Sequence, residues 1–414
     1  MPRLRKQPLG RYRYVRLRWR VAFAVIDFVG SAVFALAAAV RRLLGGRERA
    51  TRRDPRTILL VQLDHLGDSI ITTSILPALR SRYPEASIEV LAGAWNREVF
   101  EACPEVDRVY VSQVNRFARG GLRRIAWIPA TFWWGLRLRL RRKVDLGIDV
   151  RGEFPLALIL WLCGARRRVG WDCGGGGFLL TDRADFVRGR PEVLSRWALL
   201  EQLGIRRPEE FDAWQPRFPR RLPETAARSR AGVPLVVLHV GAGTEAKQWP
   251  ASHWRELLGR ILVGRDARVV LVGGKKDRSI ARRILGGRRW PGVVDQTGRL
   301  SIAELAGLLE RADVLVGADS GPAHLAAAVD TPVVVLFSGT NDPRQWQPCG
   351  RQVVVVRHEV DCSPCHRERC PVSGHPCMSR LDPERVAAEV ERVLRSNSCA
   401  RARMFDATSR ENTV

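Results

Sequence analysis

Short apolar runs that end in a polar or glycine-rich turn occur in two sets along this chain of 414 residues. The first set begins at Thr57–Leu63 and the second at Pro234–Val240. A run that is apolar at nearly every position is typical of a strand buried on both faces of a parallel sheet. A helical pattern follows most of the turns, which predicts right-handed βαβ units. We therefore expect an α/β protein with two Rossmann-like domains that face each other across a central cleft.

A polar stretch with three prolines, residues 215–232, separates the two sets and is predicted to be the linker. The predicted organisation is a basic and apolar membrane-associating segment (1–56), an N-terminal acceptor-side domain (57–214), the linker, a C-terminal domain (233–380), a helix (381–396) and a disordered tail (397–414).

Positive charge is concentrated in two parts of the chain. Lys and Arg number 69 against 43 Asp and Glu, a formal net charge of +26. Residues 1–56 hold 15 basic and 3 acidic side chains and residues 111–144 hold 9 and none, which together supply +21 of the total. Such zones can bind nucleic acid, anionic lipid or an acidic substrate. A non-catalytic nucleic-acid-binding protein is disfavoured, because the charge lies outside the second domain and no nucleic-acid module is recognisable.

The first basic zone encloses a long apolar run, Val21–Val40, interrupted by Asp27. Its length matches a bilayer span, but arginines on both flanks give no orientation bias. Three interpretations stay open: a helix lying in the membrane interface, a spanning helix, and a soluble helix packed on the body. The interfacial helix on an anionic membrane surface is favoured, because arginines would meet lipid phosphates while the aromatic side chains insert. The second zone, rich in tryptophan, is equally compatible with a packed helix and with a second membrane contact.

A carboxylate follows the first predicted strand. Asp68 lies in the turn at 64–69, at the carboxyl edge of the predicted sheet, where open α/β proteins bind ligands. No G-x-G-x-x-G accompanies it, so a dinucleotide fingerprint is absent. Asp68 is either a helix cap or a general base.

Polar residues also gather at the carboxyl edge of the second predicted sheet. The turn Asp319–His324 stands between a strand and a helix, and Gly241–Thr244, Lys247 and Asp277 follow other strands. Backbone amides and a lysine suit phosphates, and a carboxylate suits ribose hydroxyls. The set predicts a nucleotide-sugar site, although each residue alone could be structural.

Four motifs together resemble glycosyltransferase family 9, the lipopolysaccharide heptosyltransferases and their relatives. They are Leu66–Asp68, His239–Pro250, Asp295–Gly298 and Asp319–His324, and the resemblance runs from about Thr57 to Leu394. It implies a GT-B fold in which the second domain binds most of the donor.

The resemblance also implies residue roles. Asp68 takes the place of the catalytic base, Lys247 of the donor-diphosphate contact, and Asp319 of a contact to the transferred sugar. Further donor-site residues implied in the same way are Gly243, Thr244, Asp277, Ser320, Gly321 and His324. Asp277 would contact the ribose, whereas His324 is at least as compatible with packing.

The implied reaction is inverting transfer of a heptose from an ADP-sugar to a lipopolysaccharide-core or related lipid-linked acidic acceptor. It would take place without a metal or another cofactor, at the cytoplasmic face of the bacterial inner membrane. A different nucleotide sugar used for another surface polysaccharide is the alternative, because loops determine contacts to the donor sugar.

Four of the nine cysteines cluster at Cys362, Cys365, Cys370 and Cys377. Their spacing is compatible with a structural zinc site. Reduced structural thiols and a redox-sensitive pair are the alternatives. Because the other cysteines are scattered, a disulfide framework is not expected and a reducing compartment is favoured.

Overall fold

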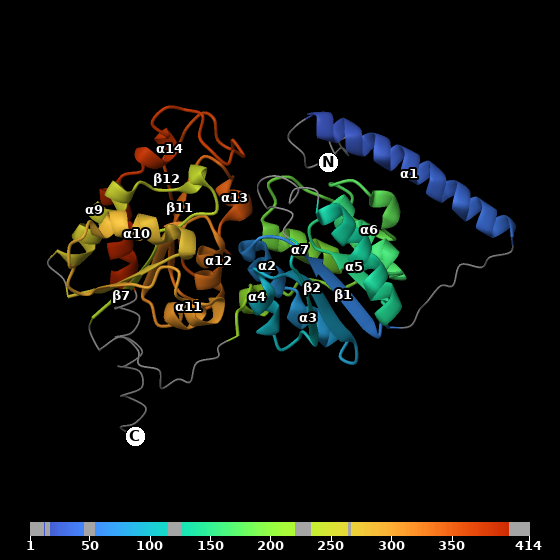
Figure 1. The fold of residues 1–414 in the computed structure, drawn as a ribbon. Coiled ribbons are helices and arrows are strands. Elements are labelled where there is room, and N and C mark those ends of the chain that lie inside the picture. The colour runs from blue at the N-terminus through green and yellow to red at the C-terminus, as the bar shows by residue number, and fades with distance from the viewer. Residues whose placement is uncertain are drawn as a thin grey trace, which may run out of the picture. The chain divides into compact units, whose positions relative to one another are not determined.

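The chain forms two compact units, Met1–Trp214 (unit 1) and Gln215–Val414 (unit 2). The computed structural model describes residues 12, 17–44, 54–114, 126–219, 233–263 and 266–396 (Figure 1). The predicted tail at 397–414, most of the predicted linker, and parts of both basic zones lie outside the described residues.

Unit 1 is built on a six-stranded parallel sheet with the strand order β3-β2-β1-β4-β5-β6. Its strands are β1 (Thr57–Gln62), β2 (Ser87–Gly93), β3 (Arg108–Ser112), β4 (Leu146–Asp149), β5 (Arg167–Trp171) and β6 (Asp182–Ala184). Its helices are α1 (Leu17–Leu43), α2 (Leu66–Thr73), α3 (Leu76–Arg82), α4 (Arg97–Glu101), α5 (Trp127–Arg141), α6 (Phe154–Leu162), η2 (Gly177–Leu179), α7 (Glu192–Glu201) and α8 (Phe211–Trp214). The first strand is buried throughout its apolar run, as expected of a strand inside a parallel sheet.

The helical pattern after β1 is divided into two helices. The sequence suggests one helix through Ile70–Leu79, whereas the structure ends α2 at Thr73 and starts α3 at Leu76. Pro77 lies in the first turn of α3, where its missing N–H costs nothing. The same proline would break a continuous helix, which explains the division.

Unit 2 has a six-stranded parallel sheet with the order β12-β11-β10-β7-β8-β9. Its strands are β7 (Leu235–His239), β8 (Arg268–Val272), β9 (Val293–Asp295), β10 (Val314–Ala318), β11 (Val333–Phe337) and β12 (Val353–Arg357). Its helices are η3 (Glu245–Lys247), α9 (Ala251–Leu262), η4 (Lys275–Asp277), α10 (Arg278–Leu285), α11 (Ile302–Leu309), α12 (Gly321–Ala328), α13 (Pro343–Trp346) and α14 (Pro376–Ser379). A last helix at 383–396 packs Val386, Val390 and Val393 into the core of this unit.

Both sheets have the same switch in strand order. In unit 1 the first strand, β1, lies beside β4, and in unit 2 the first strand, β7, lies beside β10. Successive strands are added on opposite sides of this point, so the loops after the two central strands diverge and leave a crevice for ligands. Asp68 follows β1 and Asp319 follows β10, so each predicted site is at a switch point.

Candidate active site

Asp68 is buried in the first turn of α2, with 5% of its surface exposed. The residue at the N-cap position of α2 is His65, and the side chain of Asp68 does not cap the helix. Its Oδ1 accepts a hydrogen bond of 3.2 Å from Nη2 of Arg196, and among the described residues no group donates to its Oδ2. The interpretation of Asp68 as a helix cap is therefore wrong, and one carboxylate oxygen is left to accept a proton.

Arg196 of α7 joins Asp68 to a second carboxylate. Its Nη1 donates to Glu192 at 3.0 Å, and its Nε donates to the hydroxyl of Thr72 at 3.2 Å. The guanidinium also lies over the ring of Trp171, 5.4 Å from the ring centroid. Only 2% of Arg196 is exposed, so its charge is compensated by protein groups rather than by water.

Arg151 brings a second guanidinium to the same carboxylate. Its Nη1 pairs with Asp64 and lies 3.9 Å from Oδ2 of Asp68, and its Nε donates to Glu153 at 2.6 Å. The turn that carries Arg151 follows β4 and is held by Asp149. The Asp149 carboxylate accepts hydrogen bonds from three successive backbone N–H groups, those of Arg151, Gly152 and Glu153, at 2.8–3.1 Å.

The two aspartates of this network have opposite pKa shifts. Burial, together with the charge of Asp64, raises the pKa of Asp68 to about 7 against the lowering effect of Arg151 and Arg196. Burial also acts to raise the pKa of Asp64, but the charge and hydrogen bond of Arg151 outweigh it and hold that pKa below its usual value. Neighbouring carboxylates with divergent pKa values mark an acid–base site. Asp68 can therefore exchange a proton near neutral pH.

Replacing Arg196 with methionine is expected to raise the pKa of Asp68, because the positive charge that donates to its carboxylate is lost. The remaining buried carboxylates would also destabilise unit 1 by about 3–5 kcal/mol. The midpoint of the pH–rate profile and urea unfolding report the two effects. Arg167→Met removes a half-exposed arginine paired with Asp182 and serves as the control. A wild-type midpoint in Arg196→Met would refute the coupling to Asp68.

In unit 2, Lys247 and Asp319 form an ion pair at the switch point. Lys247 Nζ donates to Oδ2 of Asp319 at 2.7 Å and to its backbone carbonyl at 3.1 Å. Asn341, from the loop after β11, donates to the same Oδ2 at 2.7 Å. The structure thus brings together two of the predicted donor-site residues and adds a third that the sequence did not suggest.

The helix α12 begins two residues after Asp319. Ser320 is its N-cap residue, but its hydroxyl does not cap the helix; it donates to the Ala318 carbonyl at 3.0 Å and lies 3.3 Å from Nδ1 of His239. Gly321 is the first residue of the helix. His324, one turn further, is buried, and burial lowers its pKa to about 4. A neutral, buried imidazole fits packing better than contact with a charged substrate.

The remaining predicted donor-site residues lie in the loops after β7 and β8. Gly243 is exposed, and the hydroxyl of Thr244 is buried without a hydrogen-bond partner among the residues that the structure describes. Asp277 is buried beside Gly241 and accepts a hydrogen bond of 2.8 Å from the backbone N–H of Gly274. Burial raises the pKa of Asp277, and its hydrogen bond stabilises the turn.

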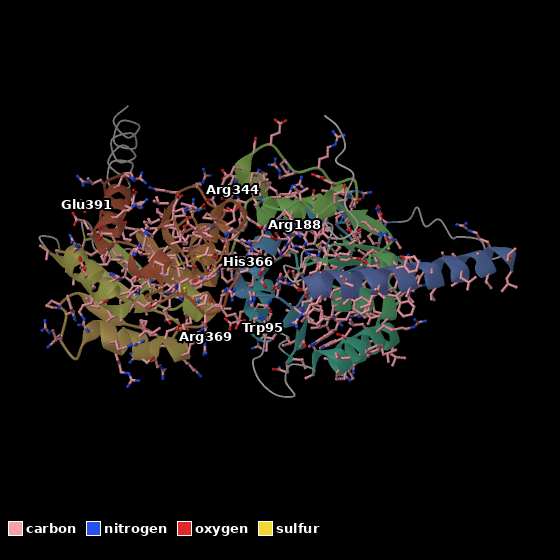
Figure 2. All side chains as sticks on the ribbon, turned by 90° about the horizontal axis from the view of Figure 1, so that it is seen from above. Trp95, Arg188, Arg344, His366, Arg369 and Glu391 are labelled. Atoms are coloured by element: carbon pink, nitrogen blue, oxygen red, sulfur yellow. The ribbon has the colours of Figure 1, made fainter. Side chains whose placement is uncertain are left out.

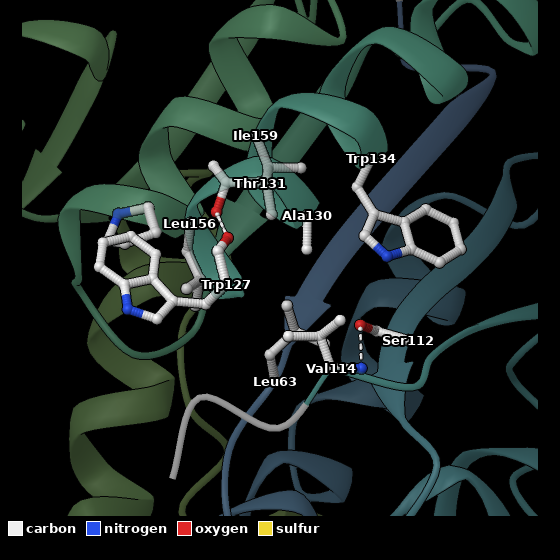
Figure 3. A pocket seen from close by; sticks show the side chains of 10 residues that line it. Leu63, Ser112, Val114, Trp127, Ala130, Thr131, Trp134, Leu156 and Ile159 are labelled. Carbon is white, nitrogen blue, oxygen red and sulfur yellow. Dashed lines mark hydrogen bonds between the residues drawn. The ribbon is translucent and has the colours of Figure 1, made fainter. Parts of the chain in front are cut away.

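A small pocket opens at the carboxyl edge of the unit 1 sheet (Figure 3). It is lined mainly by apolar side chains of α5, α6 and the ends of β1 and β3. The hydroxyls of Ser112 and Thr131 in its wall are engaged with backbone groups. None of the predicted site residues lines this pocket, so it is distinct from the Asp68 network.

The four clustered cysteines differ in exposure. Cys362 is exposed, Cys365 and Cys370 are half-buried, and Cys377 is buried, where burial raises the pKa of its thiol. Among the described residues no three His, Cys, Asp or Glu side chains are grouped as a metal ion requires. The zinc site stays a prediction that these positions do not support.

Together these features define the class of the protein. Two Rossmann-like units in one chain, with a buried carboxyl of raised pKa in the first and a lysine–aspartate pair at the switch point of the second, are typical of a GT-B glycosyltransferase. The chain belongs to glycosyltransferase family 9 (heptosyltransferase), whose match covers residues 133–375. It is a glycosyltransferase, and the alternative of a basic binding protein without catalysis is not retained.

Individual relatives are similar over most of their length. The chain is 25% identical to lipooligosaccharide heptosyltransferase 2 of Haemophilus ducreyi, over 81% of this chain and 99% of the relative. It is 28% identical to lipopolysaccharide heptosyltransferase 1 of Pseudomonas aeruginosa, over 81% and 98%. The solved structure of E. coli ADP-heptose lps heptosyltransferase II covers 83% of this chain and 99% of its own, with a TM-score of 0.65 and 24% identity. These similarities confirm the resemblance stated from the motifs and the GT-B fold.

Proposed function

We propose that this glycosyltransferase moves a heptose from an ADP-sugar to a lipid-linked acidic acceptor of the lipopolysaccharide-core type, with inversion at the anomeric carbon. The names of the relatives support this reaction, since they are heptosyltransferases of lipopolysaccharide or lipooligosaccharide and one is named for ADP-heptose. The basic zones and the apolar α1 support a site of action at the cytoplasmic face of the inner membrane.

The observation that carries the proposal is Oδ2 of Asp68, which accepts no hydrogen bond from the described residues, on a carboxyl whose pKa is about 7. In the proposed step this oxygen removes the proton of an acceptor hydroxyl. The hydroxyl oxygen then forms a bond to the anomeric carbon, while the bond from that carbon to the donor diphosphate breaks and ADP leaves. General-base assistance of this kind contributes about 10²–10⁴ in rate.

The leaving diphosphate gains negative charge in this step. Lys247 supplies a cation at the start of α12, and the N-terminal end of that helix supplies the positive end of its dipole. Fixed positive charge placed where negative charge develops lowers the barrier. The buried hydroxyl of Thr244, which has no hydrogen-bond partner in the described part of the chain, is the group that we expect the donor to engage on the neighbouring loop.

The pH dependence of kcat/KM follows from the pKa of Asp68. Below a pH of about 7 the carboxyl is protonated and cannot accept the acceptor proton, so we expect the rate to fall tenfold for each pH unit. Above that pH the carboxylate is ionised and the rate reaches a plateau. Initial rates between pH 5 and 9, at saturating donor, measure the midpoint. A profile that stays flat down to pH 5 would contradict the role of Asp68.

A donor screen tests the proposed reaction directly. Purified chain is incubated with a deacylated lipopolysaccharide-core acceptor and one of several nucleotide sugars, and the acceptor is analysed by mass spectrometry. We expect the mass of one heptose to be added from ADP-heptose. Addition of another sugar alone would support the alternative, a different nucleotide sugar for another surface polysaccharide. An NMR coupling constant of the new linkage reports inversion.

A further inference from the structure

Exposed large apolar side chains are concentrated on one part of unit 1. Of the 22 such residues among the described part of the chain, 18 lie at 17–44, on α5, or at Trp161 of α6, and only Val187, Val263, Val294 and Val372 lie elsewhere. The three helices are neighbours: Phe34 of α1 contacts Trp161 at 5.8 Å between ring centroids, and Gly135 of α5 packs against Leu162. A patch of this size marks an interaction surface.

The helix α1 is attached to unit 1 along one stripe. Phe23, Asp27, Gly30 and Phe34 face the unit, whereas nearly all other positions of the helix are exposed. The C-terminal end of α1 extends past unit 1 (Figures 1 and 2). Phe34 contacts the ring of Phe178 at 5.2 Å, and Gly30 lies so close to that ring that a Cβ would be 2.3 Å from it.

The glycine-rich loop at 174–177 contacts the residues of α1 that face unit 1. The backbone N–H of Gly176 donates to Asp27 Oδ1 at 2.6 Å, and Gly175, at a φ of +82°, lies directly under the ring of Phe23. Tyr12 donates its hydroxyl to Oδ2 of Asp27 at 2.7 Å. Asp27 is 3% exposed, so both oxygens of this mid-helix carboxylate are satisfied inside the unit.

These contacts are incompatible with a bilayer span. By length and composition α1 could cross a membrane. However, the residues that contact unit 1, within Phe23–Phe34, lie in the middle of that span. A spanning α1 would therefore draw unit 1 into the hydrocarbon. Detachment would instead leave a carboxylate, Asp27, at the bilayer centre, where a charge is costly, and would remove the partner of the Gly176 N–H.

The charge on this face suits an anionic surface. The only acidic residue of α1 is the buried Asp27, while Arg18 and Arg42 are exposed near its two ends. The helix α5 has no acidic residue and exposes Ile128, Phe132, Leu136 and Leu140 at successive four-residue steps. Tryptophan and arginine beside aliphatic side chains are typical of helices that lie in the headgroup region.

We infer that α1 lies flat in the membrane interface, held on unit 1 by the Gly174–Gly177 loop, and that its outer face, Trp161 and the outer face of α5 form one docking surface for an anionic phospholipid bilayer. This inference deepens the membrane location in the proposed function and rests on it. It assigns to the four-glycine loop a role in anchoring.

Vesicle binding tests the surface. Full-length chain is sedimented with phosphatidylglycerol–phosphatidylethanolamine vesicles and with phosphatidylcholine vesicles. We expect salt-sensitive binding to the first, lowered about tenfold or more by Leu136→Glu with Leu140→Glu. Val372→Glu changes an exposed apolar residue of unit 2 and is expected to bind as wild type. Equal binding by the α5 variant, or self-association without vesicle binding, would overturn the surface.

Topology tests the flat orientation. A protease that reaches only the periplasmic side should spare an N-terminal epitope tag, whereas protease added to inverted inner-membrane vesicles should remove it. The reverse result would show that α1 spans the membrane.

Asp27→Leu is expected to weaken the attachment of α1 to unit 1 and to increase the resistance of the protein to carbonate extraction. Asp27→Asn is the conservative control. The α5 variant should transfer sugar to a deacylated acceptor at the wild-type rate. If the wild type also transferred no sugar, the proposed function would be refuted, whereas the vesicle-binding result would still hold.

Discussion

Asparagine in place of Asp68 is expected to lower kcat by about 10²–10⁴ while leaving the Kd of the donor within twofold, roughly, of the wild-type value. The amide keeps the shape of the side chain and can still accept the hydrogen bond from Arg196 through its oxygen, but it cannot take a proton. The expected loss therefore falls on the chemical step. Steady-state rates and calorimetric titration with the donor separate the two quantities.

The same substitution has a distinct effect on stability. A carboxyl whose pKa in the folded state is raised stabilises the fold fully only below its unfolded pKa of about 4, and this contribution is lost as the pH rises through about 7. Asp68→Asn cannot ionise, so the variant does not lose this stability as the pH rises. We expect the variant to be at least as stable as wild type at pH 8, which excludes misfolding as the cause of inactivity.

Asp107→Asn is a suitable control for this experiment. Asp107 is half-exposed, directly precedes β3 and pairs with Arg80, outside the Asp68 network. It is expected to keep wild-type kcat. If Asp68→Asn also kept wild-type turnover, another group would have to be the base. Loss of donor binding in Asp68→Asn would instead indicate a structural role.

The strands and the edge on which the sites lie could be predicted from the sequence. Runs such as Thr57–Leu63 are apolar at nearly every position, and parallel strands place their following loops at one edge, so Asp68 and Asp319 were predictable as ligand-edge residues. The strands β5, β6 and β12 were not predicted as strands. Two of them, β6 and β12, lie at sheet edges, and β5 begins with two arginines, which weakens the apolar signal.

The partners of Asp68 could not be predicted in the same way. Arg196 lies 128 positions away in the chain, on a helix rather than after a strand, and its burial is decided by the packing of α7 against α2. Arg151 and Asn341 do follow strand ends, so their position was a usable signal. The sequence alone suggests a flexible loop at 174–177, because the partner of this loop, Asp27, is 149 positions away.

Replacing Lys247 with alanine is expected to raise the Kd of the donor by about 10- to 100-fold. Two effects act in the same direction. The ammonium that would contact the diphosphate is lost, and Asp319, buried and held otherwise by Asn341, keeps an uncompensated negative charge beside the incoming phosphates. Lys143→Ala, an exposed lysine of unit 1, removes the same charge at a distance and is expected to bind the donor as wild type.

A double substitution separates these two effects. In Lys247→Ala with Asp319→Asn the repulsive charge is gone, so donor binding is expected to recover only in part if Lys247 contacts the diphosphate. Full recovery would mean that Lys247 merely neutralises Asp319, and the assignment of the lysine to the donor would be wrong. Calorimetric titration of the wild type, both single variants and the double variant with ADP gives the coupling free energy. ADP is the appropriate probe because it carries the diphosphate without the sugar, so contacts of Asp319 to the transferred sugar do not enter the comparison.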